Sequence, residues 1–285
     1  MKLLITGASG QLGREWVLFC EERAISFEAF DSRALDITNK ELVRDICERV
    51  KPDVLINCAA YTKVDMAEDE PELSEQINSE ALAHISSICS EMGIKLIHYS
   101  TDYIFGGTKN DQEKMPNGYP EDYETDPINV YGATKRNGEQ TVIVSGCEFL
   151  ILRVSWLCGR FGNNFVKTMI RLGTEKDELN VVNDQFGSPT FADQVVEQSF
   201  ELLNQAKMGI YHLSSEGVTT WYDFAKEIFR LKEIDVSINP VNSEMFKTKA
   251  KRPAFSKLST KKISLLPNIE IIDWQKGLQK LFKTI

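Results

Sequence analysis

The chain has 285 residues, of which 42% are hydrophobic and 26% charged, and its formal net charge is −9. This length suits one α/β domain with an added lobe, and the negative charge argues against nucleic-acid binding. No apolar run approaches the length of a membrane span, and the first apolar run is already needed as a strand, so we expect a cytoplasmic protein without a signal peptide.

The cysteines and histidines predict no covalent or metal framework. The six cysteines contain no Cys-x-x-Cys pair and lie mostly in apolar segments, so we expect free buried thiols. The three histidines are scattered and lack metal-ligand spacing. The sequence therefore predicts no metal site.

The first residues predict a strand, a glycine-rich turn and a helix. Residues 1–5 form an apolar run that leads into Thr6-Gly-Ala-Ser-Gly-Gln-Leu-Gly13, and a helical pattern follows from Glu15. Glycines let the backbone approach a pyrophosphate, and the helix offers free N–H groups and its positive dipole end. The spacing Gly-x-x-Gly-x-x-Gly could also be a plain tight loop. Its place between strand and helix favours dinucleotide binding.

A second predicted strand at 27–30 ends at Asp31. A carboxylate there would accept hydrogen bonds from an adenosine ribose, which favours NAD. Arg33 could instead pair with a 2′-phosphate, so NADP stays open, and both residues could be ordinary loop charges. Thr38 and Glu41 have the spacing of a helix N-cap with an acid three residues on.

Two more strands are predicted at 53–57 and 95–99. The first runs into Cys58-Ala-Ala-Tyr-Thr62, where small residues would let a cofactor lie close to the backbone. The second ends at Ser100-Thr-Asp102. Helical stretches such as 71–92 between strands indicate a doubly wound parallel sheet, in which ligands bind at the carboxyl ends of the strands.

The segment Tyr131-Gly-Ala-Thr-Lys135 predicts carbonyl chemistry. Residues four apart share a helix face, so the Lys135 charge would favour the Tyr131 phenolate and lower its pKa from about 10. Such a phenol can donate or take a proton near neutrality. The spacing alone usually marks a mere surface pair, and Tyr222 and Lys226 repeat it. Only the first pair follows a strand that ends in a hydroxyl, at Thr101.

The rest of the chain gives weaker signals. The segment 106–126, with two prolines and several acids, predicts a mobile loop over the crevice. The helix that carries the second Tyr/Lys pair is amphipathic and has a threonine cap. The remaining predicted elements are strands at 148–153, 180–184 and 209–214 and helices at 190–206 and 219–230.

Motifs of one family occur in order along nearly the whole chain. They are Gly7–Gly13, Leu35–Thr38, Asn57–Thr62 with Val64-Asp65, Tyr99–Tyr103 with Phe105, Asn129–Gly132 with Lys135, Arg153–Trp156, Asn163–Phe165, Asn183–Thr190 and Arg252-Pro253. Together they resemble the extended short-chain dehydrogenases, and within them the dTDP-4-dehydrorhamnose reductases. The resemblance implies NADPH- or NADH-dependent reduction of the 4-keto group of a dTDP-6-deoxyhexulose, in the making of dTDP-rhamnose for cell-surface polysaccharide.

The resemblance also implies catalytic roles. Tyr131 would be the proton donor to the developing alkoxide, and Lys135 would lower its pKa and hold the nicotinamide ribose. Thr101 would hydrogen-bond the sugar carbonyl. A hydroxyl and an acidic phenol would thus stabilise the charge that builds on oxygen, while the cofactor supplies the hydride.

Binding residues follow from the same resemblance. Trp156 could equally be a core residue and Arg252 a surface charge, although local basic groups must attract an anionic substrate to a negatively charged chain. The implied cofactor residues are Gly7, Gly10, Gln11, Leu12, Gly13, Asp31, Ser32, Asp36, Ile37, Ala59, Ala60, Tyr61, Thr62, Tyr131 and Lys135. The implied substrate residues are Val64, Thr101, Asp102, Tyr103, Trp156 and Arg252.

The family also suggests a division of the chain. We expect an NAD(P)-binding Rossmann domain with the catalytic residues at 1–156, and a mainly substrate-binding lobe, interleaved with the sheet, at 157–285. The expected partner is a dTDP-sugar, with neither nucleic acid nor membrane. The oligomeric state is open, and a homodimer fits.

Other functions stay open at this point. Nucleotide-sugar 4,6-dehydratases share the glycine turn and the Tyr/Lys pair, but they use an Asp-Glu pair after the threonine, whereas here Asp102 precedes Tyr103. Epimerases and other nucleotide-sugar reductases share the catalytic set. The chain could also bind cofactor without turnover, like the regulatory subunit of methionine adenosyltransferase, although the complete catalytic set opposes this.

Overall fold

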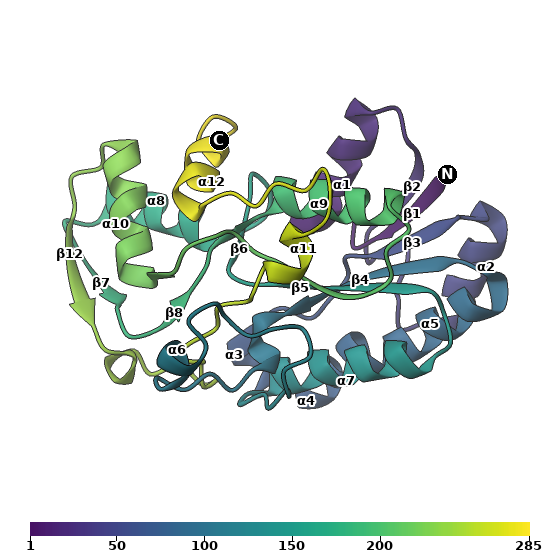
Figure 1. Cartoon of the computed structure of the whole chain (residues 1–285), viewed down its shortest axis with the longest axis horizontal. Helices are drawn as coiled ribbons and strands as arrows, with labels where there is room; N and C mark the ends of the chain where they lie inside the picture. Colours follow the sequence, from purple (N-terminus) through teal and green to yellow (C-terminus); the bar gives the residue numbers. More distant parts are fainter.

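A six-stranded parallel sheet forms the centre of the computed structural model, which describes all 285 residues (Figure 1). Its strand order is β10-β5-β4-β3-β1-β2, and every neighbouring pair is parallel. The predicted doubly wound α/β fold is confirmed. The sheet strands are β1 (Lys2–Thr6), β2 (Ser26–Phe30), β3 (Val54–Asn57), β4 (Lys95–Thr101), β5 (Phe149–Val154) and β10 (Gly209–Leu213).

Helices cover both faces of this sheet. On one face α1 (Gln11–Glu22) packs beside α9 (Ala192–Asn204), and on the other lie α2 (Lys40–Val50), α5 (Ala81–Met92) and α7 (Val130–Val144) (Figure 1). Successive side chains of β1 enter opposite cores, Leu3 and Ile5 one and Leu4 the other. Because β1 is buried on both faces, its sequence is an unbroken apolar run.

The order in which the strands are added across the sheet reverses at β1, which pairs with β2 on one side and with β3 on the other. In open parallel sheets such a switch point opens a crevice outside the carboxyl ends of the strands. Gly7 directly follows β1 and lies close to the residues after β3, since a Cβ on Gly7 would be 2.6 Å from the Ala59 nitrogen. Only a glycine allows this approach.

The second half of the chain builds a smaller lobe. Strands β7 and β12 pair in parallel, and α8, α10 and α12 enclose one apolar cluster. β10 belongs instead to the central sheet, and α9 packs on one face of that sheet. The assignment of the lobe to substrate binding stays a prediction. Its elements are β6 (Leu157–Cys158), α8 (Phe165–Glu175), β7 (Glu178–Val182), β8 (Phe186–Gly187), β9 (Thr190–Phe191), β11 (Thr219–Thr220), α10 (Trp221–Lys232), β12 (Ser237–Val241), η3 (Ser243–Met245), α11 (Lys261–Ser264) and α12 (Trp274–Leu281).

One predicted helix cap is wrong and one predicted helix is subdivided. The side chain of Asn39, not Thr38, accepts the Leu42 N–H at the start of α2, because Thr38 is bound to Asp36. The predicted helix 71–92 consists of α4 (Pro71–Glu75), a π-helical turn η1 (Gln76–Glu80) and α5.

The segment 106–126 is anchored, contrary to the expected mobile loop. It follows the short helix η2 (Asp102–Ile104) and contains α6 (Asp111–Lys114). Tyr119 is 1% exposed, stacks on Phe105 at 4.5 Å and packs against Phe255 and Leu258. These aromatic contacts come from residues distant in sequence, which the local pattern does not reveal.

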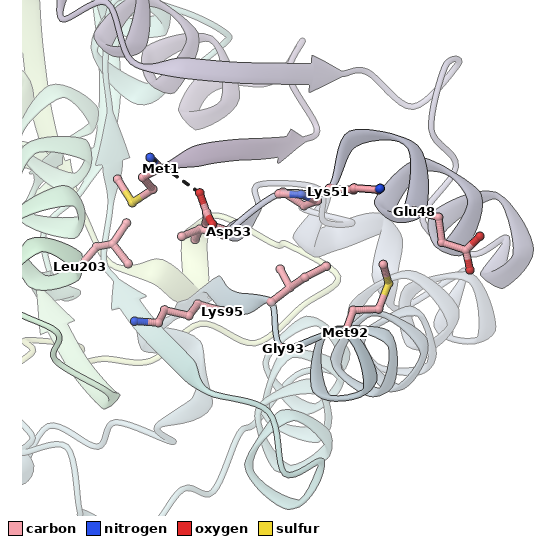
Figure 2. Close-up of a pocket in the computed structure, with 11 residues that line it drawn as sticks. Met1, Glu48, Lys51, Asp53, Met92, Gly93, Lys95 and Leu203 are labelled. Atoms are coloured by element: carbon pink, nitrogen blue, oxygen red, sulfur yellow. Dashed lines mark ion pairs between the residues drawn. The ribbon is translucent and has the colours of Figure 1, made fainter.

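A cavity of about 900 Å³ lies at the edge of the sheet where its strands begin (Figure 2). Met1, Asp53 and Lys95 line it, and the Met1 amino group forms an ion pair with Asp53 at 3.7 Å. These residues stand at the amino ends of β1, β3 and β4, whereas ligands of this fold bind at the carboxyl ends. This cavity is therefore no candidate for the active site. No helix combines the length and the hydropathy that crossing a bilayer requires.

Candidate active site

The N-terminal end of α1 fits a pyrophosphate. Gly10 is the N-cap residue, no side chain satisfies the first N–H groups, and the first turn contains no acid. Gly7 has a φ of +65°, and a Cβ on Gly13 would lie 2.2 Å from the Gly7 carbonyl oxygen. The turn thus keeps its backbone open and its free N–H groups near the positive end of the helix dipole.

The two predicted cofactor residues after this turn have side chains engaged elsewhere. The Gln11 amide donates to the Leu157 carbonyl at 3.2 Å and accepts from Asn164 at 2.8 Å. Leu12 is buried in the core beneath α1. Only the backbone N–H groups of Gln11 and Leu12 are therefore available to a phosphate, and Gln11 ties the turn to the smaller lobe.

Asp31 lies at the carboxyl end of β2, as predicted. Its Oδ1 accepts the N–H groups of Arg33 and Ala34, both at 3.0 Å, so the second carboxylate oxygen is left for a ribose hydroxyl. Ser32 and Arg33 beside it are exposed. Asp36 is also exposed, but Ile37 packs in the core and can offer only its backbone to an adenine.

The segment 59–62 after β3 is held by a residue that the sequence analysis missed. Asn78 accepts the Tyr61 N–H at 2.9 Å and donates to the Tyr61 carbonyl at 3.1 Å, and it also donates to Thr134 at 3.1 Å. The Tyr61 hydroxyl donates to Glu70 at 2.6 Å, so its side chain points away from the crevice. An asparagine in a helical run gives no sequence signal for this role.

Thr101 and Tyr131 meet at the carboxyl end of β4. Thr101 is the last residue of β4, and Tyr131 lies in the first turn of α7, close enough for the Thr101 side chain to act on the Tyr131 pKa. The Thr101 hydroxyl donates to Oδ1 of Asp102 at 3.1 Å. Gly132 lets α7 approach closely, since a Cβ there would be 2.1 Å from the Tyr103 carbonyl oxygen. The Tyr103 ring packs edge-on against Tyr131 at 5.9 Å.

The pKa of Tyr131 differs from the sequence-based prediction. Burial raises it to about 12, although the neighbouring Thr101 side chain acts in the opposite direction. Lys135 is 2% exposed, and burial lowers its pKa to about 8. Its Nζ donates to the Tyr99 carbonyl at 2.6 Å and lies 3.1 Å from Nε2 of His98. The Tyr131 pKa is raised, not lowered as predicted, and Lys135 is not among the groups that shift it.

The substrate-side residues follow β4 and β5. Asp102 is 3% exposed, and burial raises its pKa to about 7. Trp156 has a φ of +45°, which is rare for a bulky residue, and stacks on Trp221 with ring centroids 3.5 Å apart. Gly187 makes room for this indole, since a Cβ there would be 2.6 Å from it. Trp221 was missed because it appears in the sequence only as another aromatic at a helix start.

Arg252 is not a lone surface charge. It pairs with Asp65 at 2.8 Å, and it lies near enough to Tyr103 for the two groups to shift each other's pKa. Val64 precedes Asp65 at the start of α3 (Val64–Ala67), so two predicted substrate residues lie side by side. Arg252 and Trp221 also line a cavity of about 640 Å³ in the smaller lobe.

The second Tyr/Lys pair lies on α10, which begins at Trp221, and not on α7 with Tyr131 and Lys135. Thr220 caps this helix by accepting the Asp223 N–H, and the apolar side chains of α10 are buried against α8. Lys226 lies over the Tyr222 ring at 5.9 Å. This is the packing helix that the sequence predicted.

Comparison with known proteins covers the whole chain. The model of the family described as RmlD substrate binding domain matches residues 1–285. The chain belongs to this family. An RmlD-family relative from Aggregatibacter actinomycetemcomitans, named dTDP-4-dehydrorhamnose reductase, is 38% identical over 98% of both chains. The spore coat polysaccharide biosynthesis protein SpsK of Bacillus subtilis is 36% identical over 98% of this chain and 96% of its own.

A solved RmlD-family structure agrees with the fold over its full length. It is a dTDP-4-dehydrorhamnose reductase from Bacillus anthracis in complex with NADP, with a TM-score of 0.94 and 39% identity, covering 100% of this chain and 99% of its own. The predicted resemblance is therefore confirmed.

Proposed function

We propose that this RmlD-family protein reduces the 4-keto group of dTDP-4-dehydro-L-rhamnose to give dTDP-L-rhamnose, with NADPH or NADH as the reductant. The meeting of Thr101 and Tyr131 at the carboxyl end of β4 carries this proposal. It is supported by relatives of equal length that are named for this reaction. The protein is accordingly an oxidoreductase of dTDP-rhamnose biosynthesis.

The cofactor site fits a dinucleotide. The N–H groups at the start of α1 would hold the pyrophosphate, Asp31 and Ser32 the adenosine ribose, and residues 59–62 with Lys135 the nicotinamide side. NADPH is the first choice, because the Bacillus anthracis relative was solved with NADP and Arg33 is exposed beside Asp31. Bound there, the reduced nicotinamide supplies the hydride that the chemistry requires.

The side chains of the site stabilise the charge that builds on the sugar oxygen. Tyr131 is a hydroxyl donor, and Thr101, whose hydroxyl donates to Oδ1 of Asp102 at 3.1 Å in this structure, becomes a second one when it turns to the substrate oxygen. Donors fixed in such a site act more strongly than water would. A Tyr131 pKa of about 12 keeps the phenol protonated at neutral pH, which is the form that a proton donor needs.

The nucleotide part of the substrate is assigned to the smaller lobe. The cavity of about 640 Å³ has aromatic walls in Phe165, Trp221 and Phe246, with Arg252 at its edge. Aromatic faces suit a pyrimidine base, and a guanidinium suits a diphosphate. Val64, Asp102, Tyr103 and Trp156 would then surround the sugar.

A binding protein without turnover is the main alternative. It is disfavoured because Thr101, Tyr131 and Lys135 are all present and lie together on β4 and α7. The two functions differ in a simple assay, in which purified protein, NADPH and dTDP-4-dehydrorhamnose are mixed and the absorbance of the reduced cofactor is followed. The reductase oxidises NADPH only when the sugar is present and forms dTDP-rhamnose. Tight cofactor binding without oxidation would refute the proposal.

A further inference from the structure

A chain of buried polar side chains runs from the sheet to Lys135. The Thr6 hydroxyl donates to Oδ1 of Asn57 at 2.6 Å, Nδ2 of Asn57 lies 3.2 Å from Nδ1 of His98, and Nε2 of His98 lies 3.1 Å from Nζ of Lys135. All four residues are 1–2% exposed. Burying such a group of polar side chains in otherwise apolar strands is energetically unfavourable unless each side chain is fully hydrogen-bonded.

The sheet itself aligns this chain. Thr6 on β1 is paired with Asn57 on β3, and Asn57 is paired with His98 on β4, so the three residues stand in one row across neighbouring strands. Tyr99, one residue further on β4, points to the opposite face and bonds Trp16. Only the His98 face of β4 reaches α7 and Lys135.

The protonation of this chain follows from what each group can do. A neutral imidazole has one donor and one acceptor nitrogen, and an ammonium can only donate. With Lys135 charged, Nε2 of His98 must therefore accept and Nδ1 must carry the proton. A rotation of the Asn57 side-chain amide by 180° exchanges its oxygen and its nitrogen. The amide oxygen then accepts from Nδ1–H of His98, and the amide nitrogen donates to the Thr6 hydroxyl. In the other orientation the Asn57 amide nitrogen donates to Nδ1 of His98, so the imidazole proton lies on Nε2. Lys135 must then accept that proton's hydrogen bond, which only the neutral amine can do.

We propose that His98 is a positioning residue of the reductase site, which accepts a hydrogen bond from the Lys135 ammonium at Nε2 and is held in the Nδ1–H tautomer by Asn57 and Thr6. This inference rests on the function proposed above. His98 and the Tyr99 carbonyl then occupy two of the three ammonium N–H groups. The third is left for the crevice, and the buried charge is compensated.

No other side chain hydrogen-bonds the Lys135 ammonium, and the charges around it are few. The titratable groups on α7 are Tyr131, one turn before Lys135, and Glu139, one turn after it. The Glu139 charge favours protonation of Lys135. Glu139 is itself bound to Arg153 of β5 at 2.8 Å. From β4, burial and the Lys135 charge hold the His98 pKa well below its usual range, so the imidazole stays neutral. Asp102, beyond Tyr131, acts on that phenol.

Nitrogen NMR tests the tautomer without any need for activity. The chain has three histidines, so the His98 signals in a long-range ¹H–¹⁵N spectrum of the ¹⁵N-labelled protein can be assigned from their loss in His98→Gln. At neutral pH we expect His98 to be a neutral Nδ1–H tautomer, and Lys135→Met to shift its Nε2 signal strongly. An Nε2–H tautomer in the unaltered protein, or a signal that ignores Lys135→Met, would overturn the inference.

The pH profile of kcat tests the role in catalysis. His98→Leu removes the acceptor and destabilises the ammonium, so the alkaline fall in kcat should move to lower pH and kcat should drop at least tenfold. His98→Gln, whose amide oxygen can accept, should restore most of kcat and the position of the fall. His84→Leu on the outer face of α5 is the matched control and should leave the profile unchanged.

The two possible failures are distinguishable. An unaltered profile in His98→Leu, or a His98→Gln variant no better than His98→Leu, would refute the positioning role while the reductase activity of the original protein stands. If the original protein shows no reductase activity, the proposed function fails instead. The tautomer measurement then still decides the structural claim, and it does so even if His98→Leu does not fold.

Discussion

Tyr131 and Lys135 show how burial changes the chemistry expected from spacing alone. The i, i+4 spacing predicted a phenol of lowered pKa, but the phenol lies against Tyr103 and Thr101 and has a pKa of about 12. The same burial lowers the Lys135 pKa to about 8. At neutral pH the phenol is therefore protonated and Lys135 is an ammonium, and the ammonium form is lost as the pH rises through about 8.

Removing the phenol hydroxyl should abolish most of the activity. Tyr131→Phe deletes the proton donor but keeps the ring that packs on Tyr103, so kcat should fall by a factor of about 10² to 10⁴ with the NADPH Kd nearly unchanged. Tyr222→Phe, the matched control with the same spacing to a lysine, should keep full activity. Steady-state kinetics and cofactor titration measure both quantities. A fully active Tyr131→Phe would exclude Tyr131 from the chemistry.

Gly7 offers a second test at the scale of one residue. Gly7→Ala places a Cβ 2.6 Å from the Ala59 nitrogen at a φ of +65°, which should disturb the crevice and weaken NADPH binding at least tenfold. Gly93→Ala has a φ of +66° but nothing within 4 Å, so it carries the backbone strain alone. That control should lose about 1 kcal/mol of stability and keep its NADPH Kd. Equal NADPH affinity in both variants would contradict the assigned cofactor site.

At the scale of elements, the sequence predicted the strands better than their connections. The six sheet strands were found because each is a short apolar run, and α7 was placed by its position between β4 and β5. The cap of α2 was missed by one residue because Thr38 and Asn39 are both cap formers, and Asp36 decides between them by binding Thr38. The anchoring of 106–126 depends on Phe255, far along the chain, which no local pattern reveals.

The candidate site was predictable where it follows strand ends. Thr101, Asp31 and residues 59–62 come directly after strands, and the fold brings such positions to one edge of the sheet. The contact between His98 and Lys135 was not predictable, because it depends on which face of β4 meets α7. Asn78 was likewise hidden within a helical run.

The π-helical turn η1 should matter to the cofactor through Asn78. Asn78→Leu removes the hydrogen bonds to Tyr61 and Thr134 and leaves buried polar groups unpaired, so we expect a loss of about 2 kcal/mol of stability and a weaker NADPH Kd. Thr220→Ala removes the cap of α10 and should cost about 1 kcal/mol with no change in Kd. Urea unfolding and cofactor titration separate the two effects. An unchanged Kd in Asn78→Leu would show that the turn does not support the cofactor site.

At the scale of the whole molecule, ion pairs and buried groups connect the two parts of the chain. Arg252 of the second half binds Asp65 of α3, and Arg160 after β6 binds Glu15 of α1 at 2.8 Å. The Gln11 side chain adds two hydrogen bonds to the same connection. The glycine-rich turn and the smaller lobe are therefore joined directly.

Buried histidines should make the protein less stable in mild acid. His98 and His212 are 0–1% exposed, and burial holds the pKa of each well below its usual range, whereas the pKa of buried Asp102 is raised to about 7. Below about pH 6.5 the unfolded chain gains two histidine protons that the folded chain does not, and the folded chain gains one on Asp102. The net difference is one proton, so stability should fall by about 1 kcal/mol for each pH unit.

Urea unfolding between about pH 6.5 and 5 measures this slope, because above that range the proton uptake of Asp102 in the folded chain cancels the uptake of the histidines in the unfolded chain. His212→Gln removes one of the two histidines, so its slope should be close to zero. A stability that rises on acidification over this range would show that the histidines are not held neutral.

The transfer of deuterium from the cofactor tests the central claim most directly. NADPH carrying deuterium at the reactive position of the nicotinamide is incubated with the protein and dTDP-4-dehydrorhamnose, and the product is examined by mass spectrometry and NMR. We predict dTDP-rhamnose with one deuterium at C4 for each NADPH oxidised, and no transfer in Tyr131→Phe beyond its residual rate. Cofactor oxidation without deuterium at C4, or bound NADPH that is never oxidised, would contradict the account.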